Sequence, residues 1–68
     1  MSIQLVINGD TRSFEGEPTL TDVLEALGVG AAGTAVILDG EIIAAADYTA
    51  TRPGDGAELE IVRMVGGG

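Results

Sequence analysis

The sequence ends in three glycines, Gly66, Gly67 and Gly68, which directly follow the apolar residues Met64 and Val65. Glycine loses more backbone entropy than any other residue when it is ordered, so such a tail adds nothing to a fold. Without side chains, however, it fits a narrow channel and can present the Gly68 carboxylate to another protein's active site. Because a frayed chain end explains three glycines equally well, the tail needs support from the rest of the chain.

The remaining side chains offer no catalytic or metal-binding set. The 68 residues contain neither histidine nor cysteine, which argues against zinc ligation, disulfides and an enzyme of this size. Glu58 and Glu60 would share one face of a strand, where they are predicted to be solvated rather than an acid–base pair. Residues 54–56 lack the lysine and hydroxyl of a phosphate loop and are predicted to be a turn. We therefore predict a protein that is not an enzyme, with no catalytic residue, no metal and no permanently bound cofactor.

The charge is strongly acidic and points to protein partners. Eleven Asp and Glu residues stand against three arginines and no lysine, for a net charge of −8. That balance argues against nucleic acids and anionic membranes as partners and favours a basic protein surface. The chain begins without the basic and apolar segments of a signal peptide, and no apolar stretch is long enough to span a membrane. A cytoplasmic location is the expectation.

The first 14 residues predict a β-hairpin. Ile3, Leu5 and Ile7 alternate with Gln4, Val6 and Asn8, which is the period of two of a half-buried strand. Asn8-Gly9 is a strong turn signal because both residues tolerate positive φ. Residues 11–14 then form the returning strand.

A short amphipathic helix is predicted to follow the hairpin. Thr19 is a candidate N-cap, and Asp22 stands where a capping box usually has Glu or Gln, so only the hydroxyl half of that box is expected. An apolar stripe at helical spacing comprises Leu20, Val23, Leu24 and Leu27. With Gly28 as its C-terminal stop, the helix has about three turns and must dock on a sheet to be stable.

The second half of the chain predicts more strands and completes an α+β fold. Residues 34–38 and 41–43 read as strands joined by a turn, residues 44–51 are ambiguous with a helical turn near Asp47, and residues 58–64 form the last strand. We expect a mixed sheet with one main helix packed on one face. Parallel pairing of the first and last strands would make this a β-grasp. Residues 1–65 are the predicted domain, and residues 66–68 a flexible glycine-rich tail.

Three apolar residues near the tail are candidates for a partner-binding surface. Val62, Met64 and Val65 run from the outward face of the last strand into the glycines. If exposed, they form an apolar patch of the kind that marks partner surfaces. The alternative is that residues 44–51 cover them.

Nearly the whole chain resembles the ThiS-type sulfur carriers, which belong to the ThiS/MoaD group of ubiquitin-like β-grasp proteins. The resemblance is carried by an ordered set of segments: residues 3–9, 19–28, 34–43, 55–62 and 65–68. Relatives usually end in two glycines, and Gly66 is an addition to that pattern. Tyr48 stands where an aromatic residue, often tryptophan, is common.

The resemblance implies a function for the tail in thiamine biosynthesis. A ThiF-like (E1-like) adenylating enzyme would use ATP and magnesium to convert the Gly68 carboxylate into an acyl-adenylate, with Gly66 and Gly67 threading its channel. This activation is needed because a C-terminal carboxylate, with a pKa of about 3.5, is ionised and a poor electrophile at neutral pH. Sulfur from a persulfide donor would then give a thiocarboxylate on Gly68, which a ThiG-like thiazole synthase would consume.

Several other functions fit the same sequence features. A MoaD-type carrier for molybdopterin synthase, or a carrier for another sulfur pathway, would have the same tail and fold. A ubiquitin-like modifier would join Gly68 to a substrate lysine. A plain interaction domain with an incidental tail remains the alternative from a different class.

Overall fold

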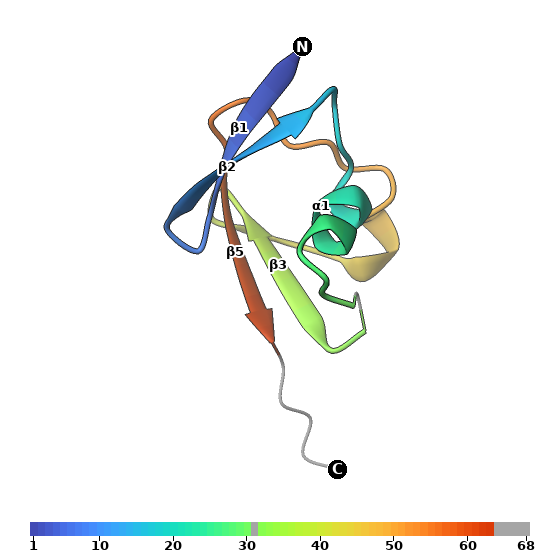
Figure 1. The fold of residues 1–68 in the computed structure, drawn as a ribbon. Helices are drawn as coiled ribbons and strands as arrows, with labels where there is room; N and C mark the ends of the chain where they lie inside the picture. The colour runs from blue at the N-terminus through green and yellow to red at the C-terminus, as the bar shows by residue number, and fades with distance from the viewer. Residues whose placement is uncertain (31, 64–68) are drawn as a thin grey trace.

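The computed structural model describes residues 1–30 and 32–63, which form a mixed five-stranded sheet with one α-helix on one face (Figure 1). The elements are β1 (Ser2–Ile7), β2 (Asp10–Glu15), α1 (Leu20–Ala26), β3 (Thr34–Leu38), β4 (Glu41–Ile43), a 3-10 turn η1 (Ala45–Asp47) and β5 (Glu58–Arg63). The strand order is β2-β1-β5-β3-β4. Strand β5 runs parallel to β1 and antiparallel to β3. This is the β-grasp topology, so the predicted α+β fold is confirmed.

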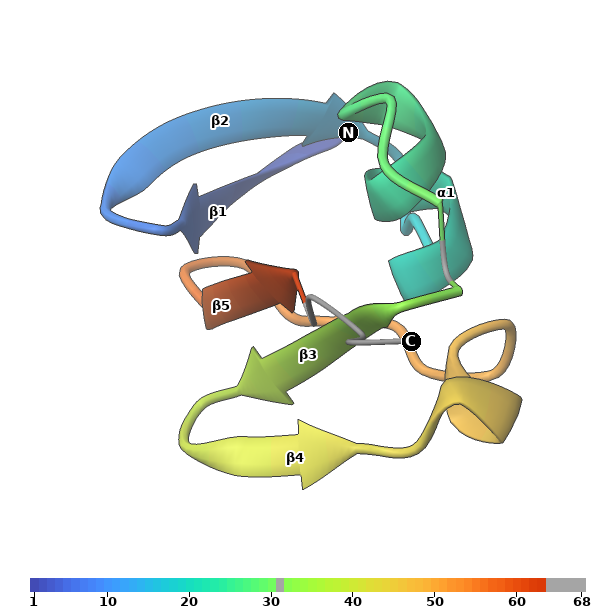
Figure 2. The ribbon, with the colours of Figure 1, turned by 90° about the horizontal axis from the view of Figure 1, so that it is seen from below.

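The last strand occupies the centre of the sheet (Figure 2). The sequence predicted that this strand extends to Met64, but residues 64–68 lie outside the described part of the chain. For the same reason the division into a domain of residues 1–65 and a tail of residues 66–68 stays a prediction.

Both hairpins turn through the residue pairs that the sequence indicated. Asn8 and Asp39 adopt φ values of 49° and 48°, and the glycines after them, Gly9 and Gly40, adopt 88° and 85°. Two successive left-handed residues fit the twist of antiparallel strands, and asparagine, aspartate and glycine adopt that conformation most easily. The turns therefore fix where β1 and β3 end, on either side of β5.

Helix α1 begins with a complete capping box. The Asp22 backbone N–H donates to the Thr19 hydroxyl over 3.1 Å, and the Thr19 backbone N–H donates to the Asp22 carboxylate over 3.0 Å. The expectation that only the hydroxyl half would form is wrong, because aspartate at N3 reaches the cap backbone here. The pKa of Asp22 lies below its ordinary value. The main cause is the hydrogen bond from the Thr19 backbone N–H to the Asp22 carboxylate, and the second is the hydrogen bond with the Thr19 side chain. The helix has 7 residues and is shorter than the three turns expected.

The hydrophobic core lies between α1 and the sheet. Its buried residues come from the helix, from the central strands and from the segments that connect them: Leu5, Ile7, Leu20, Val23, Leu24, Val36, Tyr48, Ala57 and Leu59. The predicted apolar stripe of the helix is confirmed, with Leu27 partly buried at its end. Because Leu59 of β5 belongs to this core and Ile61 packs against it, the core holds in place the strand that leads to the tail.

The segment of residues 44–51 packs on the same side of the sheet as α1 (Figure 2). Its Tyr48 is 2% exposed, and the Tyr48 hydroxyl accepts from the Val36 N–H and donates to the Thr34 carbonyl, each over 3.2 Å. The backbone carbonyl of Thr51 accepts from the N–H of Leu20 over 2.9 Å. Within residues 1–30 and 32–63, the opposite face of the sheet carries no helix.

Candidate functional site: the last strand and the open face of the sheet

Strand β5 carries the chain toward the candidate reactive group. It pairs with β3 from Leu38↔Leu59 to Thr34↔Arg63. With β1 it shares a shorter ladder, Val6↔Glu58 and Ile7↔Leu59. Gly66, Gly67 and Gly68, the predicted threading and reactive residues, lie outside the described residues. The described site is therefore the anchor of the tail.

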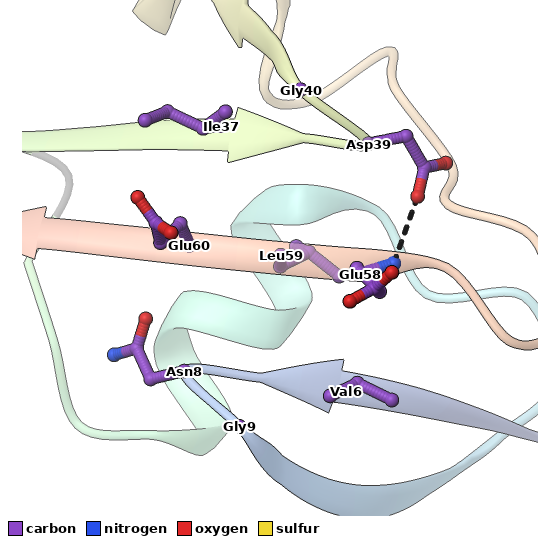
Figure 3. Close-up of a pocket in the computed structure, with 9 residues that line it drawn as sticks. All are labelled: Val6, Asn8, Gly9, Ile37, Asp39, Gly40, Glu58, Leu59 and Glu60. Atoms are coloured by element: carbon purple, nitrogen blue, oxygen red, sulfur yellow. Dashed lines mark hydrogen bonds between the residues drawn. The ribbon is translucent and has the colours of Figure 1, made fainter.

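Side chains from the two hairpin turns hold the two ends of β5. Asn8 donates its backbone N–H to the Leu59 carbonyl over 2.9 Å. Its carboxamide then accepts from the Ile61 N–H over 2.9 Å and donates to the Ile61 carbonyl over 3.3 Å. At the start of the strand, the Asp39 carboxylate accepts from the Glu58 N–H over 2.9 Å. Figure 3 shows Asn8 and Asp39 on opposite sides of β5.

Sequence reasoning treated Asn8 and Asp39 as turn residues and missed these contacts with β5. Asn8 and Ile61 are separated by 53 positions, and Asp39 and Glu58 by 19. The sequence held one signal for these contacts: the first residue of each turn is asparagine or aspartate and not glycine. Glycine also fits that conformation but has no side chain with which to bond a neighbouring strand.

The open face of the sheet exposes apolar side chains near the end of β5. Side chains alternate between the two faces of a strand, so Val62 points away from the core that holds Leu59. Val62 is 43% exposed and Ile42, on β4, is 76% exposed. Their cross-strand partners on β3 are Ala35 and Ile37.

This arrangement decides between the two expectations for Val62. Residues 44–51 lie on the helix side, so the alternative in which they cover Val62 is wrong. Met64 and Val65, the other members of the predicted patch, lie outside the described residues. Ile42 was missed, since a short apolar strand gives no sign of which of its side chains faces solvent.

An acidic pocket opens on the same face at the other end of the strand (Figure 3). It has a volume of about 500 Å³ and is lined by carboxylates and apolar strand residues: Val6, Asn8, Gly9, Ile37, Asp39, Gly40, Glu58, Leu59 and Glu60. Glu58 and Glu60 are exposed, as predicted. In the described part of the chain, no group of three acidic residues is placed to hold a metal ion. The carboxylates repel phosphate, so this pocket is unsuited to a nucleotide.

Among the described residues, no helix has both the length and the apolar character needed to cross a membrane.

The topology and the site together define a ubiquitin-like β-grasp protein whose central last strand leads into a glycine-rich end. The family model described as the ThiS family matches residues 5–68, so the chain belongs to the ThiS family.

Solved relatives have the same fold over nearly the whole chain. The crystal structure of the thiamine biosynthesis protein ThiS from Geobacter metallireducens matches with a TM-score of 0.81 and 32% identity, covering 97% of this chain and 100% of that one. A solution structure of a thiamine biosynthesis protein from the same organism matches with a TM-score of 0.76 and 32% identity, covering 97% and 88% of the two chains.

A curated relative is a much longer protein. The thiazole synthase of Paramagnetospirillum magneticum is 39% identical over 66 residues, which make up 97% of this chain and 20% of the synthase. The chain thus spans about a fifth of the length of that relative.

Proposed function

We propose that this protein is a sulfur carrier of thiamine biosynthesis, whose Gly68 carboxylate is adenylated and then converted to a thiocarboxylate. One observation carries the proposal: the match to the ThiS family runs through residue 68 and so includes all three glycines. The thiamine biosynthesis proteins of similar structure support the same pathway.

The chemistry takes place in partner enzymes and requires ATP with magnesium there. A Gly68 carboxylate oxygen attacks the α-phosphorus of ATP, pyrophosphate leaves, and an acyl-adenylate forms. The terminal sulfur of a persulfide donor then attacks the acyl carbon and displaces AMP. A thiol reductant cleaves the resulting disulfide and leaves the thiocarboxylate on Gly68. Adenylation is needed because oxide is a poor leaving group and AMP a good one.

In this proposal the carrier catalyses no step itself. Its sheet anchors the base of the tail, and the length of the tail lets the terminus reach the partner's active site. Strand β5 is held on both sides within the sheet as far as Ile61. From Arg63, five further residues extend at most about 17 Å, at about 3.3 Å per residue. A terminus on such a tether reaches a recessed active site while the folded domain stays outside.

Two partners follow from this function. One is a ThiF-like adenylating enzyme, which would bind the exposed apolar face around Val62 together with Met64 and Val65. The other is a ThiG-like thiazole synthase. The Paramagnetospirillum synthase supports this second partner, because it contains a segment related to this chain.

Intact mass spectrometry tests the proposed function. Incubation with ATP, magnesium, a cognate adenylating enzyme, a persulfide donor and a thiol reductant is expected to exchange one oxygen for sulfur. The mass of the untreated protein must first place the C-terminus at Gly68. Oxidation of Met1 or Met64 adds nearly the same mass, so fragmentation must locate the change on Gly68 and a sample without ATP must lack it. An unchanged Gly68 with verified partners would reject the carrier function.

A charge on the exposed face is expected to weaken docking of the adenylating enzyme. Val62→Asp should raise the KM for the carrier about 10-fold and leave kcat unchanged. A 10-fold change corresponds to about 1.4 kcal/mol of docking free energy, and the minority of interface residues that dominate binding cost more than about 1 kcal/mol when they are changed. Ser13→Asp adds the same charge on the distant strand β2, where Ser13 is exposed, and is the matched control. Equal KM values for the two variants would place the docking surface elsewhere.

A further inference from the structure

We propose that Asn8 is a positioning residue for the reaction at Gly68, because its carboxamide clamps Ile61 and so fixes the direction in which β5 leaves the sheet. The inference rests on the proposed function, since it takes Gly68 as the reacting residue. The inference assigns a role in this reaction to Asn8, which is far from the tail in sequence. The glycine pattern of the tail gives no indication of that role.

The clamp forms where the β1–β5 ladder stops. Registered pairing between these strands ends at Ile7↔Leu59. In a ladder, alternate residues direct their backbone groups to the same neighbour, so Ile61 is the next residue of β5 to face β1. Strand β1 has already turned away at Asn8, whose φ is 49°. The N–H and carbonyl of Ile61 would therefore lack a strand partner on this side.

The Asn8 side chain takes the place of the missing strand. It offers one acceptor and one donor, and both are used, at 2.9 Å to the Ile61 N–H and 3.3 Å to the Ile61 carbonyl. The carboxamide thus reproduces the pair of hydrogen bonds that a further residue of β1 would make. The clamp extends the hold of β1 on β5 to a point two residues before Arg63.

Position along β5 separates this clamp from its counterpart at Asp39. Asp39 bonds Glu58, the first residue of the strand, whereas Asn8 bonds Ile61 near its end. Beyond Leu59, the ladder with β3 and the Asn8 clamp are what the structure shows holding the β5 backbone. Without the clamp, β3 still pairs with Val62, so the docking face stays in place. The end of β5 then has hydrogen bonds on the β3 side only, and its direction varies more.

This geometry predicts a loss in kcat rather than in KM. When the exit direction of the strand varies, a smaller fraction of docked carriers holds its carboxylate in line with ATP, and a higher carrier concentration cannot restore that fraction. A misplacement of about 1 Å can cost up to about 100-fold in rate. For Asn8→Gly we expect about a 10-fold lower kcat for adenylation.

The experiment compares two variants that remove one clamp each and keep both turns. Asn8→Gly and Asp39→Gly each leave a Gly-Gly pair, which suits the left-handed turn. Amide hydrogen exchange should speed up about 10-fold at Ile61 in Asn8→Gly and at Glu58 in Asp39→Gly. Single-turnover adenylation with the partner enzyme should lose rate in Asn8→Gly, and less than about 2-fold in Asp39→Gly. Asn8→Asp keeps the acceptor for the Ile61 N–H but loses the donor, so its kcat should lie between wild type and Asn8→Gly.

The outcomes separate this inference from the proposed function. Slow adenylation of Asn8→Gly with fast exchange at Ile61, at a melting temperature like that of Asp39→Gly, supports the positioning role. Equal kcat values for the two glycine variants, or unchanged exchange at Ile61, overturn it and leave the carrier function intact. Failure of the wild-type protein to be adenylated by an active partner overturns both. Should Asn8→Gly not fold, Asn8→Asp decides by kcat, because it keeps the acceptor for the Ile61 N–H. A kcat below those of the wild type and Asp39→Gly supports the positioning role, and a kcat equal to that of Asp39→Gly overturns it.

Discussion

Replacing Gly67 by valine is expected to stop adenylation of Gly68 while leaving the fold intact. The valine side chain would obstruct a channel that admits a bare backbone, and its branched Cβ restricts the conformations that the end of the chain can adopt. We expect the rate of adenylate formation to fall by about 100-fold or more, because misplacing the carboxylate removes it from in-line geometry with ATP. Appending one residue after Gly68 should have the same effect by moving the carboxylate.

The chain offers a matched control for this substitution. A Cβ at Gly54 meets no atom within 4 Å, and its φ is not in the left-handed region. Gly54→Val therefore adds the same side chain to a surface loop and should be adenylated at the wild-type rate. Thermal unfolding should be similar for both variants, since Gly67 has no side chain that a core could lose. Normal adenylation of Gly67→Val would mean that the tail is not threaded through a close-fitting channel.

Much of the fold was predictable because its signals are local. The alternation in β1, the Asn8-Gly9 and Asp39-Gly40 turns and the apolar stripe of α1 each depend on residues a few positions apart. Parallel pairing of β1 with β5 joins the two ends of the chain. Composition does not specify such pairing, and it followed from the resemblance to a known family.

The features that sequence reasoning missed depend on side chains meeting distant backbone. Asn8 bonds Ile61 across the sheet, and Tyr48 bonds the edge of β3 through its hydroxyl. The side chain at position 22 completed the capping box because its carboxylate reached the backbone N–H of Thr19, and propensity alone does not settle such a contact. The sequence predicted the glycine-rich end as the candidate reactive group and also predicted the last strand, whereas the side-chain contacts that hold this strand required the structure.

Truncating Leu24 to alanine is expected to destabilise the fold strongly. Leu24 is 2% exposed and belongs to the core between α1 and the sheet. Leu→Ala at such a site removes apolar contacts and leaves a cavity, at a cost of about 2–5 kcal/mol. A domain of this size has a total stability of about 3–5 kcal/mol, so a large share of the molecules should be unfolded at 25 °C. Urea unfolding followed by circular dichroism measures the loss.

The comparison with Ile42→Ala makes this test specific to the helix-on-sheet core. Isoleucine has the same number of carbon atoms as leucine, and Ile42 is 76% exposed on the open face. Its truncation should cost less than about 1 kcal/mol, mainly through weaker strand propensity. A 7-residue helix is not stable alone in water, so α1 forms because it buries Leu24 and its neighbours against the sheet. Loss of Leu24 should therefore unfold the helix and the sheet in one transition, and equal costs for the two variants would contradict the packing that holds β5 in place.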